Sequence, residues 1–138
     1  MYKIRFDEQR GLLKVTMLSG LKVYNAERAI SEIIKYGGVA RARFGQLHML
    51  LDARKGAKLP DEVAGRFGSY EKLMLTGPDD RMAVLVDTHV HKQQTRHAMQ
   101  GQRIGIFISQ SSALTWLTGQ VHPASQLPGS TAISRLAS

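Results

Sequence analysis

A chain of 138 residues with an apolar fraction of 43% is long enough to form one domain with its own core, so disorder is not the expected state. It has no cysteine, which excludes disulfides and thiol chemistry. Nineteen lysines and arginines against eleven aspartates and glutamates give a net charge of +8. The positive residues are spread along the chain without interleaved aromatic residues, so we expect a solvated basic surface rather than a nucleic-acid site.

The first strands and the first helix follow from the N-terminal third. The segment 2–7 and the alternating segment 12–18 predict an antiparallel hairpin joined by a short polar turn. A helix capped by Asn25 should follow and stop at Gly45. We expect a kink or break at Gly37–Gly38, because each glycine costs a helix about 1 kcal/mol relative to alanine.

Three later segments are apolar and barely alternate, which is typical of central, parallel strands covered on both faces. Helices are predicted between them and after them, the last one capped by Ser109 or Ser111. The strands are expected in "LHMLLDA" (47–53), "MAVLVD" (82–87) and "IGIFIS" (104–109), and the helices at about 60–75, at about 89–99 and after 109.

This order of elements predicts an α/β fold. An N-terminal β-hairpin is followed by alternating α/β units, which should form a mixed, mostly parallel five-stranded sheet with helical cover. The domain is expected to span residues 1–119. Residues 120–138 are rich in Ser, Pro and Gly and are expected to form a flexible tail.

The N-terminal segment "MYKIRFDEQRG" carries charges where a signal peptide would be apolar. No later run of apolar residues reaches the length of a membrane span. We therefore expect a cytoplasmic protein that makes no contact with a membrane.

The element order, the strand "LHMLLDARKG" that ends in an aspartate, the "RMAVLVD" strand and the closing "IGIFISQSSALTWL" unit resemble the SpoIIAA-like members of the STAS (sulfate transporter and anti-sigma factor antagonist) superfamily. These are relatives of bacterial anti-sigma factor antagonists. The resemblance covers about residues 2–118. It implies a STAS-like fold and a regulatory role that depends on association with a protein partner.

One feature of those antagonists is missing here. In them, a second aspartate followed by serines opens the helix after the strand, and a kinase phosphorylates one of the serines. Asp52 matches the first aspartate and Asp61 falls near the second, but residues 53–68 contain no serine or threonine. Because a phosphate ester needs a hydroxyl group, we expect an interaction domain that is not switched by phosphorylation at this junction.

Polar residues follow each of the three predicted central strands. The carboxyl ends of parallel strands meet at one edge of a sheet, where ligands commonly bind. A small apolar or anionic ligand is therefore an alternative to a protein partner. The candidate binding residues of this edge are Asp52, Arg54, Lys55, Asp61, Asp87, His89 and Ser109.

Two interpretations of this edge stand side by side. Asp52, Asp87 and His89 would permit metal-dependent or acid–base chemistry, which makes a small enzyme an alternative function. The other interpretation is a structural role, in which both aspartates cap helices or bind loop amides. Because nothing completes a catalytic set, we expect a non-enzymatic protein with no catalytic residue, metal or cofactor.

The other histidines are expected to be structural or solvated. His89, His91 and His97 do not have the spacing that places metal ligands on one helix face, so they are predicted to lie on a solvated basic helix. His48 lies inside an apolar strand and is predicted to be a satisfied core histidine.

The predicted helix at 60–75 has more apolar residues than one buried face requires. An exposed excess of this kind usually contacts a partner, and we expect a homodimer or another protein complex. A nucleic-acid binder that relies on net charge is the remaining alternative. The candidate interface residues are Phe67, Tyr70, Leu73 and Met74.

Overall fold

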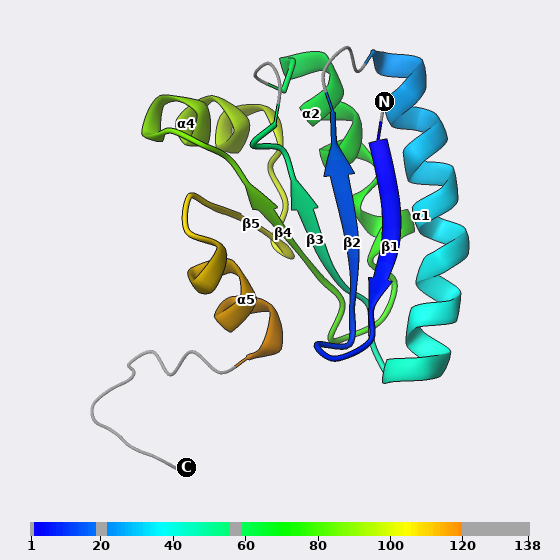
Figure 1. Cartoon of the computed structure of the whole chain (residues 1–138). Coiled ribbons are helices and arrows are strands. Elements are labelled where there is room, and N and C mark those ends of the chain that lie inside the picture. Colours follow the sequence, from blue (N-terminus) through cyan, green and yellow to red (C-terminus); the bar gives the residue numbers. More distant parts are fainter. Residues whose placement is uncertain (1, 19–21, 56–58, 120–138) are drawn as a thin grey trace.

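The computed structural model describes residues 2–18, 22–55 and 59–119, so the predicted tail at 120–138 lies outside the described residues. Figure 1 shows a twisted sheet with helices on both faces. In chain order the elements are β1 (Tyr2–Asp7), β2 (Leu12–Met17), α1 (Val23–Phe44), β3 (His48–Asp52), α2 (Asp61–Ser69), α3 (Glu71–Met74), β4 (Arg81–Leu85), α4 (His89–Ala98), β5 (Ile104–Phe107) and α5 (Gln110–Thr118).

The five strands lie in the sheet in the same order as in the sequence. β1 and β2 are antiparallel, whereas each pair from β2 to β5 is parallel. The predicted α/β fold, a hairpin followed by alternating units around a mixed, mostly parallel sheet, is therefore confirmed. Its central row places Val15 beside Leu51, Leu51 beside Val84, and Val84 beside Ile106.

This strand order decides which face the helices cover. Crossovers between parallel strands are right-handed, and when each strand is added on the same side of the last, every crossover helix falls on one face. Accordingly, α1 contacts α2 and α3, and α2 contacts α4. Among the described helices, only α5, which follows the last strand, packs on the other face, against β3, β4 and β5 (Figure 1).

The two faces have separate cores. The larger core lies beneath the crossover helices, where side chains such as Ile33, Met49 and Phe67 are completely buried. Burying one such side chain stabilises the fold by about 1.5–3 kcal/mol, so this core supplies most of the apolar driving force. The smaller core beneath α5 comprises Leu12, Leu50, Ala83, Leu85, Ala113 and Leu117.

The expected break in the first helix is wrong, because α1 runs without interruption through Gly37 and Gly38. Gly37 is buried, and a Cβ there would lie 3.1 Å from Cδ2 of Leu47. The glycine lets α1 pack closely against the chain entering β3, and this packing outweighs the low helix propensity of glycine. The cap is also different from the prediction. Asn25 lies inside the helix and its Oδ1 accepts the Lys22 N–H at 3.0 Å.

The helix predicted at 60–75 is divided at Tyr70 into α2 and the short α3. The candidate interface on it needs correction, because Phe67 and Met74 are completely buried in the larger core and cannot contact a partner. The turn at Tyr70 redirects the chain so that Met74 points inward. Tyr70 is half-buried, and Leu73 alone of the four is well exposed, at 58%.

The third apolar strand is less buried than predicted. Ile106 is 8% exposed, but Ile104, Gly105 and Phe107 are only partly buried. The reason is the position of β5, which among the described strands is the last in the sheet and has a neighbour on one side only. β3 and β4 are buried as predicted, whereas β5 is only partly buried although α4 and α5 both contact it.

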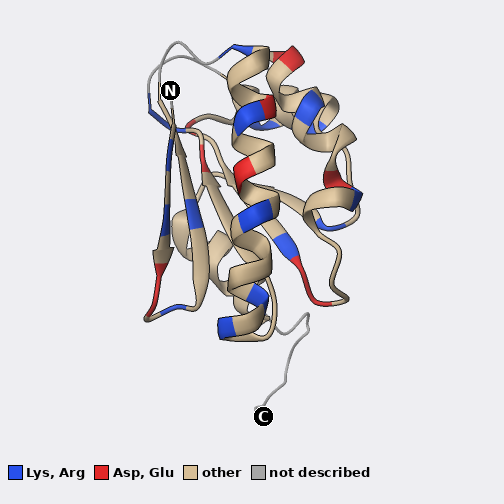
Figure 2. Ribbon diagram, turned by 90° about the vertical axis from the view of Figure 1, so that its right-hand side faces the viewer, with Lys and Arg blue, Asp and Glu red and all other residues tan. Residues whose placement is uncertain are grey.

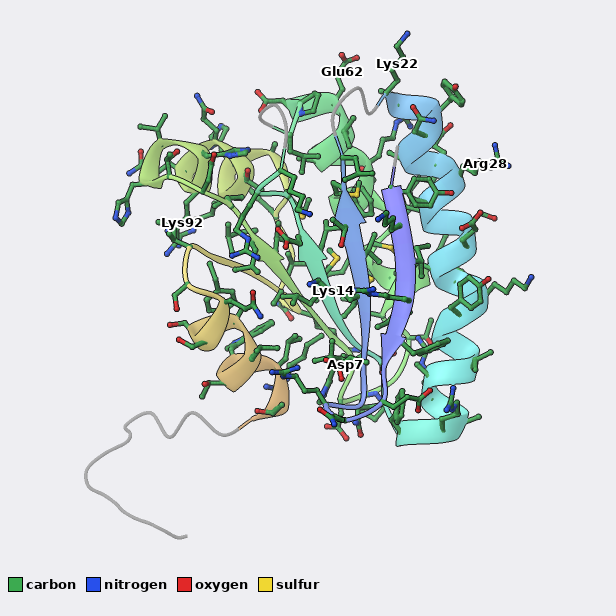
Figure 3. All side chains as sticks on the ribbon, viewed as in Figure 1. Asp7, Lys14, Lys22, Arg28, Glu62 and Lys92 are labelled. Carbon is green, nitrogen blue, oxygen red and sulfur yellow. The ribbon has the colours of Figure 1, made fainter. Side chains whose placement is uncertain are left out.

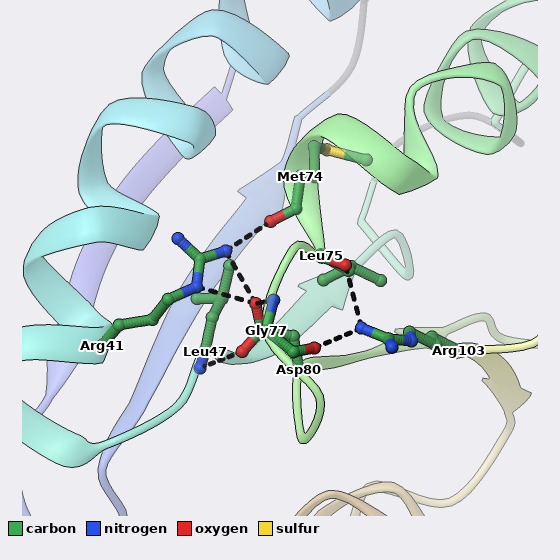
Figure 4. Close-up of polar contacts among 7 residues, drawn as sticks. All are labelled: Arg41, Leu47, Met74, Leu75, Gly77, Asp80 and Arg103. Carbon is green, nitrogen blue, oxygen red and sulfur yellow. Dashed lines mark hydrogen bonds and ion pairs between the residues drawn. The ribbon is translucent and has the colours of Figure 1, made fainter.

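A buried carboxylate, that of Asp80, ties the amino ends of the strands to the helices (Figure 4). Asp80 is 1% exposed. Its oxygens accept the N–H groups of Leu47 and Gly77, each at 2.8 Å, and Nε of Arg41 at 2.8 Å. The Arg41 guanidinium also donates to the carbonyl of Met74 at 2.8 Å. One carboxylate thus joins α1, the start of β3 and the turn that leads into β4.

A second arginine completes this arrangement. The Arg103 guanidinium donates to the carbonyls of Leu75 and Gly77, and the Arg103 N–H donates to Oε2 of Glu71 at 2.8 Å (Figure 4 draws the guanidinium). The turn after α3 is therefore held from one side through Asp80 and from the other by the chain entering β5.

We expect the Asp80→Asn variant to lose about 3 kcal/mol of unfolding free energy, because it leaves Arg41 without its counter-charge and replaces an acceptor with a donor. Urea denaturation measures this loss. The neighbouring Asp79→Asn variant removes the same charge from an exposed site and should change stability by less than about 0.5 kcal/mol. Equal effects of the two variants would contradict this role of Asp80.

The same carboxylate makes stability depend on pH. Burial raises the pKa of Asp80, but the hydrogen bonds from Leu47, Arg41 and Gly77 outweigh it and hold the pKa below the usual value of 3.8. A depressed folded-state pKa stabilises the fold above the unfolded-state pKa, and this stabilisation is lost as pH falls through the folded-state pKa. Urea midpoints of the wild type should therefore fall below about pH 4. Asp80→Asn should show a shallower fall than Asp79→Asn.

Candidate functional site

The carboxyl ends of the parallel strands share one rim, as predicted. Asp52 ends β3 and lies beside Leu85 of β4, and Leu85 lies beside Phe107 of β5. Asp87 and Ser109 follow these two strands by two residues and therefore come to the same edge. α2, α4 and α5 begin on this rim, which we call the strand-end rim. It comprises Asp52, Arg54, Lys55, Asp61, Asp87, His89 and Ser109.

Asp52 is bound to Arg54 within the rim. Asp52 is 3% exposed, and its Oδ1 accepts the Arg54 N–H at 3.1 Å and the Arg54 Nε at 3.0 Å. Nη2 of Arg54 lies 2.8 Å from Oδ2 and also donates to Gln110 at 3.2 Å. Burial raises the pKa of Asp52, but the bonds from Arg54 outweigh it and lower that pKa. The carboxylate is therefore charged and neutralised internally.

Asp87 contacts His91 and not the candidate residue His89. Its Oδ1 lies 2.8 Å from Nδ1 of His91, while His89, one residue from the cap, is exposed. The other ring nitrogen of His91, Nε2, accepts the buried N–H of Leu59 at 3.1 Å. An Nε2 that accepts a hydrogen bond fixes the proton on Nδ1, so the neutral ring donates to Asp87. The hydrogen bond to His91 lowers the pKa of Asp87.

His91 is therefore not part of a solvated helix face, and that prediction is wrong. The residue is 5% exposed and links α4 to the chain that enters α2. The signal in the sequence was the four-residue spacing of Asp87 and His91 across a helix start capped by Thr88, whose Oγ1 accepts the His91 N–H at 3.0 Å. Once α4 is known to begin at His89, that spacing brings the two side chains together.

The remaining residues of the rim make fewer contacts. Ser109 caps α5, as predicted, since its Oγ accepts the Ser112 N–H at 3.3 Å, and it also lies 2.9 Å from Oγ of Ser111. Lys55 and Asp61 are exposed, the latter in the first turn of α2. The rim thus holds two internally paired aspartates and exposed polar groups around them.

His48, the other histidine of the sheet, is half-buried at the start of β3. Burial lowers its pKa, mainly through loss of hydration of the charged ring. It lies at the opposite end of the strand from Asp52 and therefore does not join the strand-end rim.

In the described part of the chain, neither the potential metal ligands nor the charged residues of α1 indicate a second functional site. Within residues 2–18, 22–55 and 59–119, no three His, Asp or Glu side chains gather closely enough to hold a metal ion. Positive and negative side chains are interspersed along α1 (Figure 2), as expected for a solvated surface. None of the helices in the described part of the chain is long and apolar enough to cross a membrane.

Comparisons of the chain with protein-family models, with curated proteins and with solved structures gave no match. The α/β fold is established by the structure itself. Function is therefore inferred from the residues of the site and from the surface around them.

We expect His91→Phe, which keeps a ring but removes the acceptor, to lose about 2 kcal/mol of unfolding free energy, because the Leu59 N–H is left buried without a partner. Hydrogen exchange followed by NMR should show faster exchange at Leu59. His97→Phe, at an exposed position of the same helix, is the matched control and should leave that exchange unchanged. Protection of Leu59 in the His91→Phe variant would contradict the link.

Proposed function

We propose that the protein is a non-enzymatic, cytoplasmic interaction domain that regulates a partner protein by binding it. The observation that carries this proposal is that the two aspartates of the strand-end rim are bonded to neighbouring side chains of this chain. Asp52 is paired with Arg54, and the His91 ring lies between Asp87 and the Leu59 amide. General acid–base catalysis needs a lone pair or a proton free to reach a substrate, and these contacts occupy both ring nitrogens of His91.

The resemblance to SpoIIAA-like members of the STAS superfamily supports a regulatory role, because those relatives act through association with other proteins. The junction after β3 carries no hydroxyl group between residues 53 and 68. Association at this domain would therefore proceed without the phosphate switch of the antagonists that it resembles.

The shape of the surface favours a protein segment over a small apolar or anionic ligand. The hollows beside α3, α4 and α5 are open to solvent and adjoin one another along β5. Sites for small molecules are usually enclosed enough to bury most of the ligand, which an open row of hollows does not do.

Purification of the tagged protein from the cells that make it tests the proposal. We expect one partner protein in a fixed ratio to this chain, and saturable binding when the two purified proteins are mixed in a calorimeter. Nuclease treatment should leave the complex intact. A preparation without a stoichiometric partner would contradict the proposal.

The enzymatic alternative is tested separately. The purified protein is incubated with a metabolite extract from the same cells, and mass spectrometry follows the compounds over time. We expect no depletion that depends on Asp52 or Asp87. A compound consumed by the wild type, but not by Asp52→Asn or Asp87→Asn protein shown to be folded, would replace the interaction domain with an enzyme.

A further inference from the structure

A trough runs along the free edge of β5. It consists of three adjoining hollows of about 860, 560 and 390 Å³. The first and second share Gln100 and Gly101, and the second and third share Phe107 and Trp116. A row of open hollows fits an extended peptide chain better than it fits one compact molecule.

The backbone of β5 offers hydrogen-bonding groups to this trough. Met82 N–H donates to the Arg103 carbonyl and Val86 N–H donates to the Phe107 carbonyl, so these residues of the β5 chain face β4. Because alternate residues of a parallel strand face the same neighbour, Ile106 turns its N–H and its C=O away from β4. β5 has no strand on that side in the described part of the chain. An added strand bonds to groups of this kind.

The wall of the trough is cationic. Lys72, Lys92, Arg96 and Arg103 line it together with one carboxylate, that of Glu71, which already accepts the Arg103 N–H at 2.8 Å. Lys92 and Arg96 lie one turn apart on α4, and neither forms an ion pair with another described residue. Figure 3 shows Lys92 projecting from α4. The charge that would balance this wall is therefore not supplied by the described part of the chain.

Two aromatic rings form an apolar floor. The rings of Phe107 and Trp116 have centroids 5.4 Å apart, and Arg81 holds Trp116 by donating to its carbonyl at 2.6 Å. A Cβ at Gly105 would lie 2.7 Å from the Phe107 ring, so the glycine allows that ring to fold back along the strand. The floor can receive apolar side chains from a chain lying beside β5.

We propose that the trough binds an extended, acidic segment of a partner protein, which adds a sixth strand beside Ile104–Phe107. Its carboxylates face Lys92 and Arg96, and its apolar side chains contact Phe107 and Trp116. This inference rests on the proposed interaction function. A second copy of this chain would bring the same cationic walls together, and residues 120–138 contain an arginine but no Asp or Glu. Charge therefore favours an acidic partner over either of these occupants.

A displayed library of random ten-residue peptides is the probe. Selection on the wild-type protein should enrich peptides rich in Asp and Glu and free of proline, and NMR should show the largest amide shifts at residues 104–108. Enrichment of basic or proline-rich peptides, or no enrichment, would overturn the proposal. So would shifts confined to the strand-end rim.

Charge reversal tests the cationic wall. The double variant Lys92→Glu/Arg96→Glu should weaken binding of the selected acidic peptide by about tenfold or more, measured by fluorescence anisotropy. The matched control Arg28→Glu/Lys35→Glu makes the same charge change on the exposed face of α1 and should weaken it far less. Equal weakening by both variants would leave only a non-specific attraction and overturn the proposal.

N-methylation of the peptide tests strand addition without altering the protein. Methyl groups on every second amide remove the donors that face β5, and this set should abolish binding. Methyl groups on the intervening amides face solvent and should be tolerated. Equal effects of the two sets would overturn the added strand.

The purified partner separates this inference from the proposed function. If Lys92→Glu/Arg96→Glu leaves the affinity for that partner unchanged, the trough is not the site, although the interaction function stands. A dimer of the isolated protein whose amide shifts lie at residues 104–108, with no binding of the acidic peptide, would assign the trough to a second copy and overturn the acidic segment.

Discussion

The fold depends on one buried carboxylate. Asp80 receives bonds from Leu47, Gly77 and Arg41. The sheet itself pairs Leu47 with the start of β4, whereas Arg41 belongs to α1 and Gly77 to the turn after α3. Apolar burial brings α1 against the sheet but does not fix where it ends relative to β3. The directional bonds to Asp80 set that position, and with it the depth at which β3 and β4 deliver Asp52 and Asp87 to the opposite rim.

The sheet could be predicted because its central strands are short, continuous apolar segments. The hairpin could be predicted because apolar and polar residues alternate in 12–18. They failed where tertiary contacts outweigh local propensity. Gly37 would weaken an isolated helix, but in α1 it meets Leu47 across a gap too small for a larger side chain. Phe67 and Met74 looked like surplus apolar surface, but Phe67 faces the core from α2. The turn at Tyr70, which leaves no periodic signal, sends Met74 inward.

The candidate rim was predicted in position but not in its contacts. Topology alone places Asp52, Asp87 and Ser109 together, whereas the choice of His91 over His89 depends on where α4 begins. The trough at β5 could not be predicted, because "IGIFIS" reads as a strand covered on both sides and nothing local marks it as the last in the sheet. Asp52 and Asp87 of the candidate rim are paired with Arg54 and His91, and Lys92 and Arg96, which form no ion pair with another described residue, lie at the trough.

The agreement between strand order and sequence order bears on how the chain folds. Each strand from β2 onward finds its neighbour already synthesised, so the sheet can assemble progressively from the ribosome-distal end without threading a segment between two others. Only the hairpin of β1 and β2 closes over a short turn, whereas each parallel pair closes over a whole crossover helix and loses more chain entropy on closure. The last unit to join is β5 with α5, and within the described residues β5 forms the border of the sheet.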